Sequence, residues 1–244
     1  MVKKDNGLNI IGVIHARGGS KRIPLKNIAL LGGKPLVSYM IRAALGSNCL
    51  RRVIVSTDHP EIKKIALECG AEVPFVRPQN LAEDCPSEWV TKHAVEFVES
   101  QESKKIDIAV TMQPTTPFCR ACDIDACVDL LLKDEGMMSA FTSRQVKERP
   151  EWMFGVKDGD RAELLLGGKM EGERGVFQSL PKLVIPNGAA YATRRQALFE
   201  EGVIISKNTG AHVMSDLSSV DIDEPIDLIF AEFLLDKKEV VIDE

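Results

Sequence analysis

A short segment near the amino terminus combines positive charge with glycine. Residues 15–27 have the sequence HARGGSKRIPLKN, which places four cations within ten positions: Arg17, Lys21, Arg22 and Lys26. Its adjacent glycines, Gly18 and Gly19, let the backbone approach an anion closely and present N–H groups to it. This combination predicts a polyphosphate-binding site, and the alternative is a solvated surface turn. The chain contains neither G-x-x-x-x-G-K-[ST] nor G-x-G-x-x-G, so it lacks the P-loop and dinucleotide-binding motifs.

Two carboxylates near the carboxyl end could hold a metal ion. Asp221 and Asp223 alternate in the segment SVDIDEPID, so an extended backbone would direct both side chains to the same side. Neighbouring like charges are costly unless a cation joins them, and hard oxygen ligands beside phosphates suit Mg²⁺. In the alternative interpretation, Asp223 caps the last helix and Asp221 is solvated.

The basic segment and the two carboxylates together indicate a reaction at a phosphate. Mg²⁺ and the cations would neutralise charge that develops on an α-phosphate and on a leaving pyrophosphate. No nucleophilic Ser, Cys or Lys motif suggests a covalent intermediate, so direct in-line transfer to a bound acceptor is the simplest mechanism.

Alternating strands and helices must position these residues. Apolar runs predict strands at 8–15, 52–57, 72–76, 106–112, 139–143 and 188–193. Helices are predicted from Pro35 to Gly46, after a cap at Asp58, around 90–98, after a cap at Asp123, and around an apolar stripe formed by Ile226, Ile229, Phe230, Phe233 and Leu234. This order predicts an open, layered α/β fold with a mostly parallel sheet. Ligands of such sheets bind beyond the carboxyl ends of the strands, where residues 16–27 leave the first strand.

The alternation breaks between residues 144 and 186, where charges, glycines and isolated apolar residues dominate. We interpret this stretch as an arm inserted into a single domain that spans residues 1–244.

Composition narrows the class of protein further. The 244 residues include 31 Lys and Arg against 36 Asp and Glu, a net charge of −5, which argues against a nucleic-acid or anionic-membrane binder. The polar start lacks a secretory apolar region, so we expect a cytoplasmic protein. The six cysteines are expected to be reduced, and Cys119-x-x-Cys122 lacks the further ligands of a zinc site.

Several motifs, taken in order, resemble one known family. These are ARGGSKRIPLKN (16–27), VSTD (55–58), RPQNLAED (77–84), QPTTP (113–117), PNGAAY (186–191) and SVDID (219–223). They resemble the acylneuraminate cytidylyltransferases, which include the CMP-sialic acid synthetases, and the resemblance covers nearly the whole chain. It implies a Rossmann-like nucleotidyltransferase fold.

The resemblance implies that CTP and a nine-carbon 2-keto sugar acid are joined into a CMP-sugar with Mg²⁺ and release of pyrophosphate. By similarity, the triphosphate site would comprise Arg17, Gly18, Gly19, Ser20, Lys21 and Lys26. The rest of the nucleotide would be held by Asn27, Arg77 and the 81–87 segment, including Ala82, Asp84 and Ser87. Gln113 and Asn187 would face the sugar. Arg17, Lys26, Asp221 and Asp223 would be catalytic, with the last two holding the metal. Family members are homodimers whose arm reaches the neighbouring subunit.

Three positions depart from the family pattern. His15 stands where the family usually has Pro, and Phe177 and Ile185 stand where relatives of the sialic-acid type carry Arg. An arginine there would pair with the sugar carboxylate. Residues that could replace it are Arg174, Lys182 and Arg195. Two alternatives therefore stay open: a related enzyme for another nucleotide or sugar acid, and a catalytically silent nucleotide-sugar binding protein.

Overall fold

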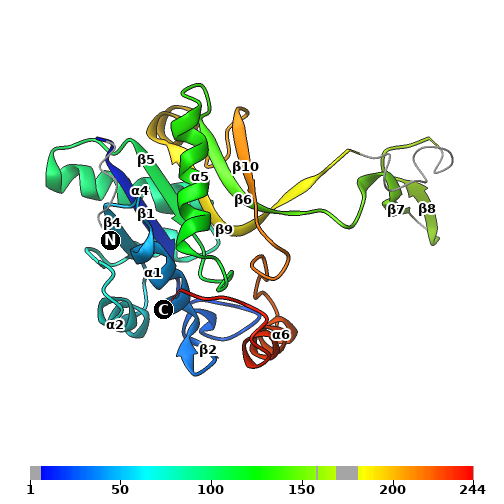
Figure 1. Cartoon of the computed structure of the whole chain (residues 1–244), viewed down its shortest axis with the longest axis horizontal. Helices are drawn as coiled ribbons and strands as arrows, with labels where there is room; N and C mark the ends of the chain where they lie inside the picture. Colours follow the sequence, from blue (N-terminus) through cyan, green and yellow to red (C-terminus); the bar gives the residue numbers. More distant parts are fainter. Residues whose placement is uncertain (1–6, 158, 169–180, 244) are drawn as a thin grey trace.

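A six-stranded sheet forms the centre of the protein (Figure 1). The computed structural model describes residues 7–157, 159–168 and 181–243. The strands are β1 (Ile10–His15), β4 (Arg52–Ser56), β5 (Ile108–Met112), β6 (Ser139–Gln145), β9 (Val184–Arg194) and β10 (Thr209–Val213), in the spatial order β10-β6-β9-β5-β1-β4. Only β9 runs antiparallel to its neighbours in this sheet, so the predicted mostly parallel α/β sheet is confirmed.

Helices cover both faces of the sheet. One face packs against α1 (Leu36–Gly46), α2 (Pro60–Glu68) and α5 (Ala121–Lys133), and the other packs against α4 (Ser87–Glu102) and the short π-helix η5 (Ala197–Glu201). The alternation of β1 explains both layers, since Ile10 and Ile14 contribute to the first core and Ile11 and Val13 to the second. The three-layer fold thus follows from strands that are apolar on both faces.

The last helix, α6 (Pro225–Asp236), closes a smaller core beneath the sheet. Ala231 and Leu234 are buried with Leu31 of the β2–β3 hairpin (Leu30–Leu31 and Lys34–Pro35). The helix itself is confirmed, but its predicted buried stripe is wrong except at Leu234. The other four members are exposed, at 47% to 64%: Ile226, Ile229, Phe230 and Phe233. The helix packs instead through Ala231 and Leu234, together with the partly buried Leu228 and Leu235.

Three local predictions are also wrong. Residues 72–76 form no strand, because Pro74 lacks an N–H and only Glu72 bridges to Ile54 at the sheet edge. Asp58 does not cap α2, whose N-cap is His59. Asp123 is the third residue of α5 rather than its cap, and it accepts a hydrogen bond from the N–H of the N-cap Arg120 (3.0 Å).

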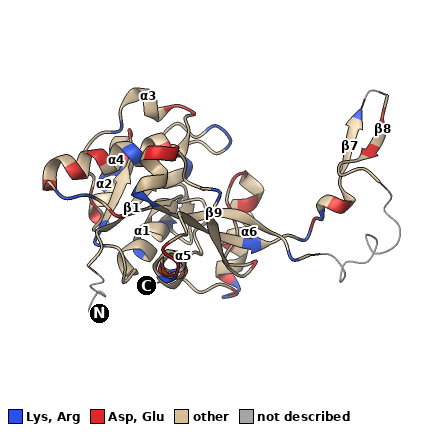
Figure 2. Cartoon of the chain, turned by 90° about the horizontal axis from the view of Figure 1, so that it is seen from above, with Lys and Arg blue, Asp and Glu red and all other residues tan. Residues whose placement is uncertain are grey.

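The described part of the 144–186 stretch projects away from the body (Figures 1 and 2). It contains a short 3₁₀ turn, η2 (Pro150–Trp152), and the hairpin β7 (Phe154–Lys157) and β8 (Arg161–Leu164). Apolar side chains on this arm, such as Phe154 and Val156, are exposed. Within the described residues, no helix combines the length and apolar character needed to cross a membrane.

Candidate functional site

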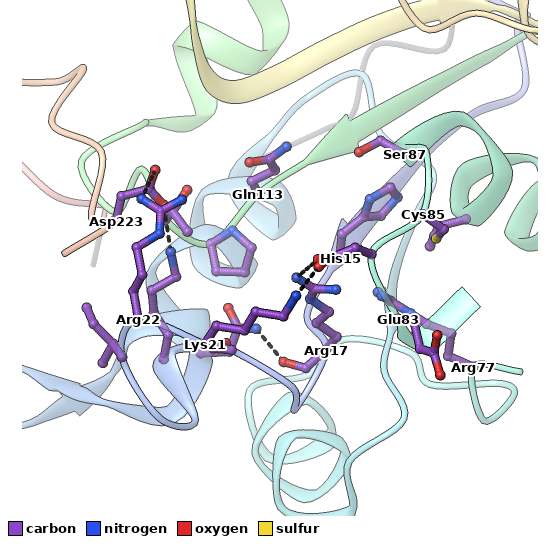
Figure 3. Close-up of a pocket in the computed structure, with 18 of the residues that line it drawn as sticks. His15, Arg17, Lys21, Arg22, Arg77, Glu83, Cys85, Ser87, Gln113 and Asp223 are labelled. Carbon is purple, nitrogen blue, oxygen red and sulfur yellow. Dashed lines mark hydrogen bonds and ion pairs between the residues drawn. The ribbon is translucent and has the colours of Figure 1, made fainter. Parts of the chain in front are cut away.

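A cavity of about 590 Å³ opens beyond the carboxyl ends of β1 and β5 (Figure 3). Ten of the predicted site residues line it: Arg17, Ser20, Lys21, Lys26, Asn27, Arg77, Asp84, Ser87, Gln113 and Asp223. Its wall also contains His15, Arg22, Ile23, Glu83, Cys85, Pro86, Val90, Pro114 and Thr115. Five predicted residues lie outside this lining: Gly18, Gly19, Ala82, Asn187 and Asp221.

Buried polar groups hold the basic loop in place. The buried Asn27, in the 3₁₀ turn η1 (Lys26–Ile28), donates through Nδ2 to the carbonyl of Arg17 (2.8 Å). The N–H of Gly18 donates to Asp58 Oδ1 (2.8 Å), so this amide is held by a carboxylate rather than presented to the cavity. A side chain at Gly18 would also collide with His59, only 2.8 Å from an ideal Cβ. Gly18 therefore serves the close packing of the loop against the start of α2.

An acidic residue forms ion pairs with two of the cations predicted to bind the triphosphate. Asp84, which follows the short helix α3 (Gln79–Ala82), pairs with Arg17 Nη2 and with Lys21 Nζ, each at 2.5 Å. The hydrogen bond from Lys21, followed in size by that from Arg17, lowers the pKa of Asp84 to about 2. Figure 3 shows Arg17 and Lys21 converging on this side of the cavity. The cavity thus has a pair of cations that already coordinate an anion.

The basic loop and the carboxyl-terminal acids meet, as the sequence predicts. Lys26 Nζ donates to Asp223 Oδ1 (2.9 Å) and to the Ile222 carbonyl (2.8 Å), and Arg22 Nη1 lies 3.3 Å from Asp223 Oδ2. Lys26, mostly buried, is the principal reason that the pKa of Asp223 is lowered. The N–H of Ile222 donates to the carbonyl of Thr115 (2.8 Å), which places the segment beside the loop after β5.

Asp221 lies next to this junction, behind Gly188. Gly188 has a φ of +84°, and an ideal Cβ there would lie 3.6 Å from Gln113 Oε1 and 4.0 Å from Asp221 Oδ2. The surrounding protein partly desolvates Asp221 and raises its pKa, and Asp223 adds to the increase by charge repulsion. The carboxylates of Asp221 and Asp223 therefore repel each other. A hard cation between them would remove this cost, so their donor chemistry fits Mg²⁺.

Two predicted ligand-binding residues are engaged inside the protein. Asn187 is buried, and its Nδ2 donates to Ser219 Oγ (2.9 Å) while its Oδ1 accepts from Thr142 Oγ1 (2.7 Å). Arg77 is also buried, and it donates through Nη2 to the carbonyl of Ser56 (2.6 Å). Burial lowers the pKa of Arg77 to about 10. Asn187 joins β9 to the segment before the two acids, and this position favours a positioning role.

A second cavity of about 320 Å³ shares Ser87 and Gln113 with the first. Its remaining wall consists of Glu88, Thr111, Tyr191, Val203, Ile204 and Ile205. The sequence analysis missed residues 203–205, because they follow η5 in a loop that carries no chemical motif. Tyr191, on β9, carries no sequence signal that distinguishes it from a core residue of the strand.

The cysteines contribute no metal cluster to either cavity. All six are free thiols. Burial raises the pKa of Cys127 to about 12 and that of Cys119 well above its usual range. In the described ranges, no three His, Cys, Asp or Glu side chains are grouped as metal ligands. Burial therefore disfavours the thiolate form of Cys119 and Cys127.

Comparison with known proteins places this geometry in a family. A family model described as cytidylyltransferase matches residues 11–223. The CMP-N,N'-diacetyllegionaminic acid synthase of Legionella pneumophila is 31% identical, with 94% of this chain and 97% of that protein aligned. The pseudaminic acid cytidylyltransferase of Campylobacter jejuni is 32% identical, with 91% and 94% aligned.

Two further comparisons extend the likeness. N-acylneuraminate cytidylyltransferase A of Danio rerio is 34% identical over 98% of this chain, but this chain spans only 55% of that protein. A structure of CMP:2-keto-3-deoxy-manno-octonic acid synthetase complexed with CTP superposes with a TM-score of 0.67 at 19% identity, covering 94% of this chain and 99% of that one. It shows the same fold. The extent of the family match, together with a basic loop joined to paired carboxylates at the sheet edge, establishes that this chain belongs to the cytidylyltransferase family of nucleotidyltransferase enzymes.

Proposed function

We propose that the protein transfers CMP from CTP to a nonulosonic acid, a nine-carbon 2-keto sugar acid, and releases pyrophosphate. The observation that carries this proposal is the junction of Lys26 and Asp223, which joins the basic loop to the carboxyl-terminal acidic segment at one cavity. The names of the relatives from Legionella pneumophila and Campylobacter jejuni support the choice of acceptor.

The two cavities, which share Ser87 and Gln113 in their walls, suit the two substrates of such a transfer. The larger cavity, with Arg17, Lys21 and Lys26 in its wall, matches the charge of a triphosphate. The smaller cavity would hold the sugar acid, and the shared Gln113 would lie where the two substrates meet. The anomeric hydroxyl would then attack the α-phosphorus, a new P–O bond would form, and the bond to the β-phosphate oxygen would break. The hydroxyl proton passes to solvent, and pyrophosphate leaves.

Magnesium is the metal we propose for this site. Asp221 and Asp223 would hold it, since their mutual repulsion favours a bound cation. When bound, Mg²⁺ supplies charge stabilisation at the phosphate groups. Lys26, already beside Asp223, orients that carboxylate and adds its own positive charge at the same place.

The residues that line the smaller cavity indicate which substituents the sugar acid carries. Val203, Ile204 and Ile205 offer no hydrogen-bond donors from their side chains, so they favour a methyl or acyl group over a hydroxylated chain. Arg195 is not the partner of the sugar carboxylate. It follows β9 at the amino-terminal end of β5, away from the cavities, and it pairs with Glu99 (2.7 Å). Lys182, at the base of the arm, is the remaining candidate to pair with the sugar carboxylate among the described residues. Arg174 and Phe177 lie outside the described residues.

We also propose that the protein is a cytoplasmic homodimer joined through its arm. The exposed Phe154, Val156, Leu165 and Leu166 support this assignment, because apolar side chains on a projecting hairpin are stabilised by a partner.

The test is a screen of pyrophosphate release. The protein is incubated with Mg²⁺, one of CTP, UTP, GTP or ATP, and a panel of sialic, legionaminic and pseudaminic acids. Release with CTP and at least one acid supports the proposal. Release with another nucleotide identifies the related enzyme instead, and CTP binding without release across the panel identifies a silent binding protein.

A further inference from the structure

His15, the last residue of β1, lines the larger cavity and is held there by a buried polar chain. Its Nε2 lies 3.0 Å from Thr91 Oγ1 on α4, and Thr91 Oγ1 lies 2.7 Å from Thr111 Oγ1 on β5. Thr91 and Thr111 are completely buried. The two threonines therefore fix the orientation of the imidazole ring from behind, and Thr111 also belongs to the wall of the smaller cavity.

The other nitrogen of the ring is available to a ligand. His15 Nδ1 has no hydrogen-bond partner among the described residues, and it is not enclosed as the Nδ1 atoms of His59 and His93 are. Burial, together with the positive charge of Arg77, lowers the pKa of His15 to about 3. The ring is therefore neutral at physiological pH, and Nδ1 offers one directional hydrogen bond without charge.

The contacts of His15 differ from those of the triphosphate cations. It precedes the basic loop and lies next to Ser87, at the start of α4, in the close-up of Figure 3. Arg17 and Lys21 pair with Asp84, whereas the ring of His15 contacts Thr91. A neutral ring contributes little to holding phosphates, but it suits the hydroxyl groups of a ribose or the polar edge of a base. The proline expected here from the family pattern has no side-chain hydrogen-bonding group.

We propose that His15 Nδ1 binds the nucleoside portion of the nucleotide and helps to select it, with Thr91 and Thr111 as positioning residues. The proposal rests on the proposed use of CTP and adds a recognition contact that the family pattern lacks. A nucleoside triphosphate that lacks the ribose hydroxyl or the base group contacted by His15 should therefore bind less tightly than CTP.

Direct binding measurements on the full chain separate this role from catalysis. Dissociation constants with Mg²⁺ are measured for CTP, 2′-deoxy-CTP, UTP and inorganic tripolyphosphate. His15→Phe keeps a flat ring and removes both nitrogens, so we expect CTP binding to weaken by about 10-fold, the size of one lost hydrogen bond. Tripolyphosphate, which has no nucleoside, should bind the variant as it binds the natural protein.

Two conservative variants sharpen the test. His15→Asn places an amide near the position of Nδ1 and should restore most of the CTP affinity. His15→Gln places its amide near Nε2, toward Thr91, and should not. This pair decides the matter even if His15→Phe fails to fold, which thermal melting reports. The nucleotide arms locate the contact, since a lost preference for CTP over 2′-deoxy-CTP points to the ribose and a lost preference over UTP points to the base.

Each outcome has a defined meaning. Equal CTP affinity in the natural protein, His15→Phe and His15→Gln overturns the proposal, and so does an equal loss for tripolyphosphate and CTP. If the natural protein binds a different nucleotide in place of CTP, the proposed function fails. The same variants, measured with that nucleotide, then still decide the role of His15.

Discussion

Lys26 Nζ lies 2.9 Å from Asp223 Oδ1, although 196 residues separate them in the chain. The same ammonium group donates to the carbonyl of Ile222, so one side chain ties the first loop of the sheet to the segment before α6. The site is thus assembled by the closure of the fold, and its charge balance depends on this contact.

Replacing Lys26 by Met should lower kcat/KM by about 100-fold or more, the usual cost of removing one charge-stabilising donor from a phosphate or oxyanion site. Lys34→Met, which removes an exposed cation from the nearby β3 strand, is the matched control and should leave kcat/KM unchanged. Steady-state pyrophosphate release measures both, and circular dichroism checks the fold. Similar rates for the Lys26 variant and the control would refute a role for this ammonium group.

Asp221→Asn and Asp223→Asn should each abolish magnesium-dependent turnover while the protein stays folded, because each removes half of the negative charge that would hold the metal. Asp236→Asn, an exposed change on α6, is the control for loss of a carboxylate. Rates are measured across a magnesium titration, with a chelator as the zero point. Activity that persists in either variant, with the same magnesium dependence, would contradict the metal assignment.

Asp84→Asn should tighten CTP binding several-fold at low salt, because it frees Arg17 and Lys21 from a competing anion. Asp84 and Lys21 are exposed and Arg17 is partly exposed, so added salt should reduce the difference between the variant and the natural protein. Titration calorimetry at two ionic strengths measures the effect. Weaker binding by the variant would show instead that Asp84 holds the nucleotide directly, as the family resemblance implies.

Gly188→Ala should lose both stability and activity, whereas Gly202→Ala should lose stability alone. Both glycines have a positive φ, which costs an alanine about 1–2 kcal/mol. At Gly188 the new Cβ would also contact Gln113 and approach Asp221, but at Gly202 nothing lies within 4 Å. Urea denaturation and kcat measure the two effects. A normal kcat for folded Gly188→Ala would show that this space is not used in the reaction.

The stability of the protein should fall with acidification in a way that depends on His15. Its pKa is about 3 in the folded protein, against 6.5 as its ordinary value, so the unfolded chain binds the proton more readily. The contribution of the neutral ring is therefore complete above pH 6.5 and declines toward pH 3, by up to about 1.4 kcal/mol per pH unit. Urea denaturation of His15→Asn between pH 7.5 and 4.5 should show a shallower decline, and an equal decline would contradict the assignment.

The sequence predicted the parts of the site that depend on local pattern. The apolar run of β1 ends at the basic loop, where ligands of such sheets bind. The complementary chemistry of a basic loop and paired carboxylates predicted that the two segments would share a site, and Lys26 and Asp223 do meet. The use of Asp58 could not be predicted, because whether a carboxylate caps α2 or binds Gly18 depends on how the loop folds back. Nor does periodicity show which side of α6 faces the protein. There the small residue Ala231 packs inside, while the larger Phe230 and Phe233 remain outside.

The long strand β9 carries the base of the arm and residues that support the site in one continuous stretch. Val184 pairs with Gln145 at the arm, and four residues later Gly188 lies against Gln113 and Asp221. Because the side chains of a strand alternate between faces, adding one residue between these points would turn Asn187 away from Thr142 and break the hydrogen bonds that hold this support in place. The tip of the hairpin is free of this constraint. Evolution can therefore lengthen or reshape the far end of the arm without penalty to the chemistry, but the four residues at its root must keep their length.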